Sequence, residues 1–309
     1  MLTDLISRHH TIGHQILDLE AELGDSTEPQ KETLDMLIQE ARRAIQVKEA
    51  YTKEEAVRIL STINNVIRSK GLNPNGAGDN QLFYEGIEAK SIDCDNTSLI
   101  YMSIADALKL PLAAVNAPKH LFVRFGLNNV SYINWETTSA RVISDDYYKQ
   151  WLNIADAAVK NGVFLRNLTR DGVIANAYNN RGATRADKGN LDKAIEDYNE
   201  AIRLDPNFVE AYNNRGNARA RKDNLDEAID DYNEAVRLNP NYALAYYNRG
   251  IALYRKGNRN RAIDDYNEAI WLDPNFALAY NNRGNARLRK FDMLGAFADF
   301  VRARIPIFR

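Results

Sequence analysis

The C-terminal half of the chain repeats one pattern of polar and apolar positions at a step of 34 residues. The phrase AYNNRG, once written AYYNRG, begins at positions 177, 211, 245 and 279, and DYNEA begins at 197, 231 and 265. Each step holds two stretches with the 3.6-residue apolar spacing of an amphipathic helix, and the second stretch ends before a proline. This half is therefore predicted to be all-α, built from helix pairs that stack on one another.

The first half has no such period and mixes two kinds of apolar spacing. Helical spacing predicts helices over residues 32–46, 52–70 and 96–110. The last of these is apolar on most of its surface, which places it in the core, and Asn96 or Thr97 can cap its start. Alternating apolar and polar residues then predict antiparallel strands over 111–117, 120–126 and 130–136. A core helix followed by a small sheet is an α+β arrangement.

The fixed step of 34 residues, with two helices per unit, resembles the tetratricopeptide repeat (TPR). The resemblance covers residues 175–309, as three full repeats and a truncated fourth. It implies an all-α TPR solenoid whose first helices line a groove for a peptide or protein partner. The sixth position of each unit faces that groove in the family, and in this chain it is Asn180, Asn214, Asn248 and Asn282.

Two interpretations stay open for the polar residues of this predicted groove. The asparagine amides can pair with the backbone of an extended peptide, or they can pack between neighbouring helices. Arginines recur near the ends of the first helices as Arg221, Arg255 and Arg289. They either give the groove a basic edge suited to an acidic or C-terminal peptide, or they are solvated surface charges.

Composition narrows the classes of function. A chain of 309 residues is long enough for two domains, and the net charge of −2 lacks the basic excess typical of nucleic-acid binding. We therefore expect no nucleic-acid partner. No stretch has the length and apolarity of a membrane span or a signal peptide, so we expect a cytoplasmic protein with no membrane contact, and leave signal-less secretion open. We expect no cofactor and no metal site.

The single cysteine, Cys94, stands at or just before the start of the predicted core helix. Backbone N–H groups at a helix N-terminus favour a thiolate over a thiol, so this position suits a nucleophile. A nucleophilic cysteine also needs a base, and His120 begins one of the predicted strands.

The third group depends on how the second and third strands pair. If residues 127–129 form a three-residue hairpin loop, His120 lies opposite Glu136, which can then orient the imidazole. A loop one residue shorter or longer would place Trp135 or Thr137 opposite His120 instead.

The order of these three residues resembles the transglutaminase-like fold, a relative of the papain-like cysteine proteases. In that order a cysteine begins a core helix, a histidine lies on a strand and an acid lies on the next strand. The match is carried by CDNTSLIYMSIADALKLPLAAVNAPKHLFVRF and NWETT, and it covers about residues 80–145. It is most similar to the SirB1-type proteins, in which such a domain precedes TPR repeats. The resemblance implies Cys94 as nucleophile, His120 as general acid/base and Glu136 as orienting acid. It also implies an oxyanion-hole side chain ahead of the cysteine, for which Gln81 or Asn80 is the candidate.

These resemblances predict four segments and two possible functions. The segments are N-terminal helices over 1–70, a transglutaminase-like core over 71–165, a linker over 166–174 and the TPR domain over 175–309. The first function is a thiol-dependent amide hydrolase or acyltransferase, whether protease, deamidase or transglutaminase, acting on a peptide or protein recruited by the groove. In that enzyme Asp93 and Asp95 would point away from the thiol, because their charges would raise its pKa. The alternative is a non-catalytic TPR adaptor with a relic transglutaminase-like domain.

The C-terminal end is more apolar than the end of a repeat array usually is. It carries Phe297, Phe300, Val301, Ile305, Ile307 and Phe308. We therefore expect this end to be covered, either by the N-terminal domain or by self-association with a second copy.

Overall fold

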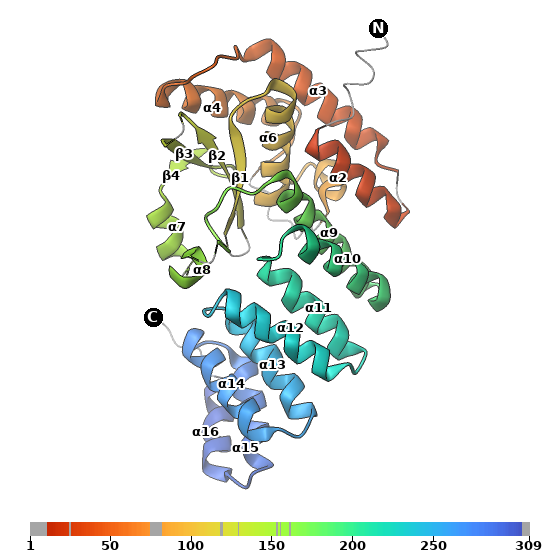
Figure 1. Cartoon of the computed structure of the whole chain (residues 1–309), viewed down its shortest axis with the longest axis vertical. Coiled ribbons are helices and arrows are strands. Elements are labelled where there is room, and N and C mark those ends of the chain that lie inside the picture. The colour runs from red at the N-terminus through yellow and green to blue at the C-terminus, as the bar shows by residue number, and fades with distance from the viewer. Residues whose placement is uncertain are drawn as a thin grey trace. The chain divides into compact units, whose positions relative to one another are not determined.

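The computed structural model describes residues 11–24, 26–74, 82–117, 120–128, 130–152, 154, 156–160 and 162–304. The chain folds into two compact units (Figure 1). The first contains the described residues of Met1–Ile154 and Phe164–Arg181, and the second those of Ala155–Val163 and Gly182–Arg309.

Helices surround a small antiparallel sheet in the first unit. The helices are α2 (Ile12–Glu20), the short 3₁₀ helix η1 (Ala21–Leu23), α3 (Glu28–Ala44), α4 (Lys53–Ser69), α5 (Phe83–Ala89), α6 (Cys94–Leu108) and α7 (Asp145–Trp151). The strands are β1 (Leu112–Ala117), β2 (His120–Gly126), β3 (Tyr132–Glu136) and β4 (Arg141–Ile143), paired in that order. The last strand was not predicted from the sequence.

Helix α6 is the centre of this unit, as its apolar surface predicts. It packs on β1 and β2 with one side and on α2 and α3 with another. Its buried Tyr101 accepts a hydrogen bond from Trp135 Nε1 on β3 (3.0 Å) and donates one to the Leu60 carbonyl of α4 (3.1 Å). Gly13 allows α2 to approach closely, because a Cβ atom there would lie 2.4 Å from Ser103 Oγ of α6.

The pairing of β2 with β3 differs from the prediction by two residues. Arg124 lies opposite Asn134 and Gly126 opposite Tyr132, so the same register places Glu136 beside Phe122 rather than opposite His120. The prediction of a direct His120–Glu136 cross-strand pair is therefore wrong. A shift of two residues leaves every side chain on its original face, so His120 and Glu136 still share one face as diagonal neighbours.

The turn between these strands explains the shift. Asn128 Oδ1 accepts hydrogen bonds from the backbone N–H groups of Val130 (2.9 Å) and Ser131 (2.7 Å). Such an Asx-type turn draws residues 130 and 131 into the loop, although their sequence continues the alternation of a strand. The loop is therefore five residues long, from 127 to 131, instead of three.

The second unit contains a helical solenoid, which confirms the all-α prediction for the repeats. Its helix pairs are α9 (Arg170–Asp187) with α10 (Leu191–Leu204), α11 (Val209–Arg221) with α12 (Leu225–Leu238), α13 (Ala243–Arg255) with α14 (Arg259–Leu272), and α15 (Ala277–Leu288) with α16 (Met293–Arg302). The short helix α8 (Asp156–Lys160) precedes them. The boundary between the units falls within α9. Residues 166–174, predicted as a linker, supply Leu168 and Val173 to the core of the first unit.

A buried ion pair recurs inside the repeats and explains the two repeated phrases. The arginine of NRG binds the aspartate of DYNEA in its own repeat and the asparagine of DYNEA in the preceding repeat. Arg215 thus contacts Asp231 Oδ1 (2.6 Å) and Asn199 Oδ1 (2.7 Å), and Arg249 contacts Asp265 Oδ1 (2.7 Å) and Asn233 Oδ1 (2.9 Å). The motif therefore joins the two helices of one repeat to the repeat before it.

No helix in the described parts of the chain combines the length and the apolarity that crossing a membrane requires.

The repeat glycines make room for aromatic rings, which leads to a first prediction. A Cβ atom at Gly216 would lie 2.7 Å from Cε1 of the buried Tyr232. We expect Gly216→Ala to lower the free energy of unfolding by about 1–3 kcal/mol, because the clash outweighs the ~1 kcal/mol that alanine gains in a helix. Urea unfolding measures this loss. Glu227→Ala, at an exposed position of α12, is the control and should change stability little. An equal or higher stability of Gly216→Ala would contradict the close packing.

Candidate functional site

Asp93 sets the position of Cys94. Its carboxylate accepts a hydrogen bond from the backbone N–H of Asn96 (2.8 Å), so Asp93, rather than the predicted Asn96 or Thr97, caps α6. Cys94 is therefore the first residue of the helix. Ser98 and Thr137 fix this end of α6 to the sheet, since Ser98 Oγ donates to the Leu121 carbonyl (3.0 Å) and lies 3.3 Å from Thr137 Oγ1.

The structure brings His120 and Glu136 together across the diagonal of the sheet. His120 Nε2 lies 2.6 Å from Glu136 Oε2. An ionised carboxylate only accepts hydrogen bonds, so the ring donates from Nε2 and Nδ1 is the nitrogen that can act as a base. Burial raises the pKa of Glu136, but hydrogen bonds from His120, Tyr148 and Thr138, with the charge of His120, bring it below its ordinary value. Glu136 thus remains a carboxylate inside the protein.

Aromatic side chains hold the imidazole in place. Phe122 and Tyr148 stack with their ring centroids 4.1 Å apart, and the Tyr148 hydroxyl donates to Glu136 Oε2 (2.8 Å). Trp151 meets the His120 ring edge-on at 5.5 Å. The His120 side chain is only 9 % exposed as a result. Tyr148 and Trp151 lie on α7, to which the sequence analysis assigned no role.

The thiol contacts a carboxylate. Cys94 Sγ donates to Asp95 Oδ1 at 3.4 Å, and no hydrogen bond joins Sγ to His120 within the described residues. Burial raises the pKa of the Cys94 thiol, and the charges of Asp95 and Asp93 raise it further, while the backbone N–H of Leu121 opposes them. The prediction that Asp95 points away is therefore wrong. Burial also raises the pKa of Asp93, to about 7.

Asp95 accepts the hydrogen bond of the thiol and also lies within range of the charge of His120. Burial raises its pKa, while the hydrogen bond from Cys94 and the charge of His120 lower it. The site therefore contains a histidine–glutamate pair, and a thiol that pairs with Asp95 and whose raised pKa disfavours the thiolate. Gln81 and Asn80, the candidates for the oxyanion hole, lie outside the described residues.

Two of the four predicted groove asparagines take part in packing between repeats, and the other two bond to the neighbouring residue of their own helix. Asn248 Nδ2 donates to Asn213 Oδ1 (2.9 Å), and Asn282 Nδ2 donates to the Tyr247 hydroxyl (3.0 Å). Asn214 accepts from Asn213 Nδ2 at 3.5 Å, and Asn180 accepts from Asn179 Nδ2 at 3.4 Å. Packing between helices, one of the two interpretations left open, therefore occupies the amide groups of Asn248 and Asn282.

The three arginines of the predicted basic edge also fall into two groups. Two of them pack between repeats, and the third lines a pocket. Arg221 Nη1 donates to the Ala186 carbonyl (2.9 Å) and Arg255 Nη1 to the Ala220 carbonyl (2.7 Å), which satisfies the C-terminal end of the first helix in the preceding repeat. Arg255 also pairs with Asp223. Arg289 has no hydrogen-bond or ion-pair partner for its side chain within the described residues, and it lines a pocket instead.

This pocket, of about 440 Å³, is formed by α13, α14 and α15. It is lined by residues at the same places in successive repeats, such as Tyr254 and Leu288, which are 34 positions apart. The lining residues are Ile251, Tyr254, Tyr266, Asn282, Asn285, Leu288 and Arg289. Two of the predicted groove residues, Asn282 and Arg289, therefore lie in one pocket with apolar neighbours.

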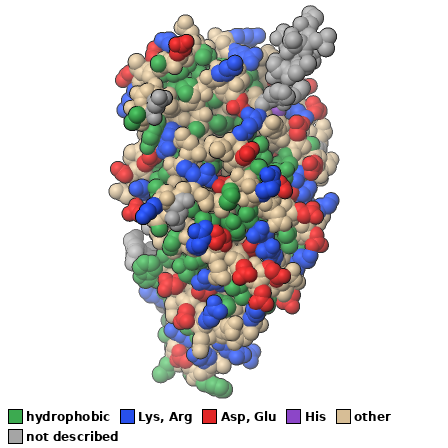
Figure 2. Space-filling view, viewed as in Figure 1, with side chains coloured by type: hydrophobic (Ala, Val, Ile, Leu, Met, Phe, Trp, Pro, Cys, Tyr) green, Lys and Arg blue, Asp and Glu red, His purple; other side chains and the backbone are tan. Residues whose placement is uncertain are grey.

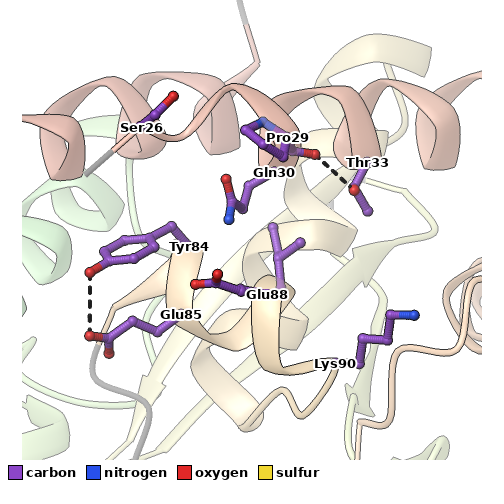
Figure 3. Close-up of a pocket in the computed structure, with 9 residues that line it drawn as sticks. Ser26, Pro29, Gln30, Thr33, Tyr84, Glu85, Glu88 and Lys90 are labelled. Carbon is purple, nitrogen blue, oxygen red and sulfur yellow. Dashed lines mark hydrogen bonds between the residues drawn. The ribbon is translucent and has the colours of Figure 1, made fainter.

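A second pocket, of about 550 Å³, lies in the first unit between α3 and α5 (Figure 3). The carboxylates of Glu85 and Glu88 line it on α5, and the buried Gln30 lines it on α3. Gln30 Oε1 has no hydrogen-bond partner among the described residues. None of the predicted site residues lines this pocket.

The apolar face predicted at the C-terminal end is present on α16. Leu294 is 86 % exposed and Phe297 is 69 % exposed, and Figure 2 shows hydrophobic side chains at the end of the second unit that α15 and α16 occupy. Ile305, Ile307 and Phe308 lie outside the described residues. Self-association through this face stays a prediction.

The diagonal geometry of the His120–Glu136 contact predicts that side-chain length matters. We expect Glu136→Asp to lower the free energy of unfolding by about 1–3 kcal/mol, because the shorter carboxylate cannot reach His120 across the diagonal and leaves buried polar groups unsatisfied. Urea unfolding measures the loss, and Glu136→Gln, which keeps the length, should lose less. Full stability of Glu136→Asp would show that the contact does not hold this region together.

Comparisons with known proteins place the repeats in a family. Models described as "TPR repeat" match residues 182–223 and 219–257, and one described as "Tetratricopeptide repeat" matches 243–276. These matches begin after the first unit, and no transglutaminase-like fold was identified there. No match was found among curated proteins.

The chain is also similar to solved structures, two of which are described as TPR domains. A crystal structure of MamA is 32 % identical over 42 % of this chain and 75 % of that one, with a TM-score of 0.40. The first TPR of Spaghetti (RPAP3), bound to the HSP90 peptide SRMEEVD, is 29 % identical over 38 % of this chain and 93 % of that one, with a TM-score of 0.37. The first TPR domain of human RPAP3 is 28 % identical over 39 % and 94 %, with a TM-score of 0.38. From the period, the helix pairs and the family models together, the C-terminal region of this chain is a tetratricopeptide repeat array.

Proposed function

We propose that this protein is a protein-interaction module that binds a peptide segment of a partner in the pocket between α13 and α15. The observation that carries the proposal is the composition of that pocket, in which apolar side chains stand beside an amide and a cation. Such a mixture is typical of ligand sites, where apolar contacts give affinity and a few polar groups give orientation.

The repeated scaffold supports this proposal. The motif arginines and two of the four predicted groove asparagines, Asn248 and Asn282, are used in packing, so the solenoid presents its groove on a fixed frame. A groove that is already formed loses little conformational freedom when a ligand binds, which favours affinity. Arg289 and the apolar Ile251, Tyr254 and Leu288 then remain to contact a partner.

Peptide selection tests the proposal. Peptides are selected from a random display library against the purified full chain, and the affinity of the selected peptides is then measured by calorimetry. We expect Leu288→Glu to weaken their binding at least tenfold, which corresponds to ~1.4 kcal/mol, because it places a charge in the apolar part of the pocket.

Trp271→Glu is the matched control, because Trp271 is 75 % exposed on α14 and does not line the pocket. The affinity of this variant for the selected peptides should equal that of the wild type. Peptides that bind Leu288→Glu as tightly as the wild type, or that lose equal affinity in both variants, would place the binding surface elsewhere.

We propose thiol-dependent acyl transfer as a second candidate, favoured by the contact between His120 and Glu136. In this reaction the sulfur of Cys94 attacks an amide carbonyl carbon, and its proton passes to His120. The proton then goes to the leaving amine as the C–N bond breaks and a thioester remains. Water or another amine cleaves the thioester and regenerates the thiol.

The contact between Cys94 and Asp95 weighs against this activity. A thiolate next to a carboxylate is disfavoured by like charge, and burial disfavours it further. Acyl transfer would require Asp95 to turn away or to be protonated. For this reason we rank the interaction module first and the enzyme second.

Alkylation of Cys94 separates the two candidates. We expect the folded wild type to react with iodoacetamide at pH 8 roughly tenfold or more slowly than the unfolded chain, because its raised pKa leaves little thiolate. Asp95→Asn should speed the reaction severalfold, since it removes the nearest negative charge. Mass spectrometry of the labelled chain gives both rates. A wild type that reacts faster than the unfolded chain at pH 7, and loses that advantage in His120→Ala, would instead support acyl transfer.

A further inference from the structure

The junction between the third and fourth repeats departs from the charge pattern of the earlier junctions. In those, a lysine that follows the first helix pairs with an aspartate that begins the second helix of the preceding repeat. Lys222 pairs with Asp192, and Lys256 pairs with Asp226. The same step of 34 residues leads next to Lys290 and Asn260, so the lysine remains and the acid is gone.

A second acid is missing at the same junction. Arg255 pairs with Asp223, and the residue equivalent to Asp223 in the next repeat is Gly257. The arginine equivalent to Arg255 is Arg289. Both carboxylates that neutralise the junction between the second and third repeats are therefore absent from the one that follows.

The third repeat carries two further cations, at two positions where the first repeat has one cation and the second repeat has none. Arg259 takes the place of Leu191 and Leu225, and Arg261 takes the place of Lys193 and Glu227. With Arg289 and Lys290 they line one pocket of about 440 Å³ whose other lining residues are Gly257, Asn258 and Asn260. Four cations and no carboxylate thus surround this pocket. None of the four has a side-chain ion pair within the described residues.

The helix that starts at this pocket adds to the positive charge. Helix α14 has no acidic residue in its first turn, whereas α10 has Asp192 and α12 has Asp226 and Glu227. The side chain of Asn258 makes no capping hydrogen bond. The N–H groups at the start of α14 therefore keep the partial positive charge of a helix N-terminus. Four neighbouring cations at such an end repel one another, and an anion would relieve that repulsion.

We propose that this basic pocket binds an anionic side chain of the partner peptide, either a phosphorylated residue or a carboxylate. The choice of a peptide rests on the proposed function, because Arg289 lines both this pocket and the apolar pocket between α13 and α15. The peptide then carries an apolar residue in the groove and, a short distance along, an anion among Arg259, Arg261, Arg289 and Lys290. This site is what distinguishes acidic or phosphorylated partners from neutral ones.

The test uses small anions, so it does not depend on finding a peptide. The purified full chain is titrated with inorganic phosphate, and separately with acetate, at constant ionic strength while backbone amide signals are followed by NMR. We expect saturable shifts at residues 257–261 and 289–290. Tighter binding of phosphate than of acetate assigns the site to a phosphorylated residue, and equal binding assigns it to a carboxylate.

A matched pair of variants tests the electrostatic argument. Asn260→Asp restores the acid that the earlier repeats carry and should weaken phosphate binding at least roughly fivefold. Asn224→Asp makes the same charge change in the equivalent loop of the second repeat and should leave the affinity unchanged. Shifts that never saturate, or an equal loss in both variants, would overturn the anion site. Peptide binding in the groove could still hold in that case. Loss of groove binding with intact phosphate binding would overturn the proposed function, and with it the choice of a peptide as the ligand, but would leave the anion site.

Discussion

The repeat array depends on one buried carboxylate in each repeat. Asp231 is 3 % exposed, yet it accepts hydrogen bonds from Arg215 and Arg219 of the first helix. A buried carboxylate is costly to desolvate, and only a full set of well-placed donors offsets that cost. The helix pair can therefore adopt few arrangements that keep the carboxylate satisfied. Because Arg215 also reaches Asn199 in the preceding repeat, the same constraint sets how successive repeats stack.

This constraint explains why the sequence predicted the solenoid well and its polar residues less well. A repeated phrase shows that a contact recurs, but it does not show whether the contact is internal or faces a ligand. The sequence left open whether the asparagines and arginines face a groove or serve packing and solvation, and in the structure Asn248, Asn282, Arg221 and Arg255 bind neighbouring repeats. Each of these residues lies 35 positions from its partner, one more than the repeat step, so each contact joins the first helices of adjacent repeats.

The first unit shows a different limit of sequence reasoning. The alternation of apolar residues located the first three strands. It also put His120 and Glu136 on one face of the sheet, because a shift of the pairing by an even number of residues leaves each side chain on the same face. The register depended on the turn, and the Asn128 side chain chose a longer turn than the pattern indicated. The two side chains still meet because glutamate is long enough to cross the diagonal. The direction of Asp95 depends on side-chain packing at the start of α6, which no local pattern records.

Departures from the repeat pattern form the basic pocket of this chain. The exchanges that create Arg259, Asn260 and Arg261 leave the buried pairs on either side intact, since Arg249 still binds Asp265 and Arg283 still binds Asp299. They therefore change the surface without changing the frame. Asn248, Arg221 and Arg255, which were predicted for the groove, bind neighbouring repeats. The positions that break the repeat pattern line a pocket instead. The four cations at this junction have no ion-pair partner among the described residues, and an external anion is the partner that we propose for them.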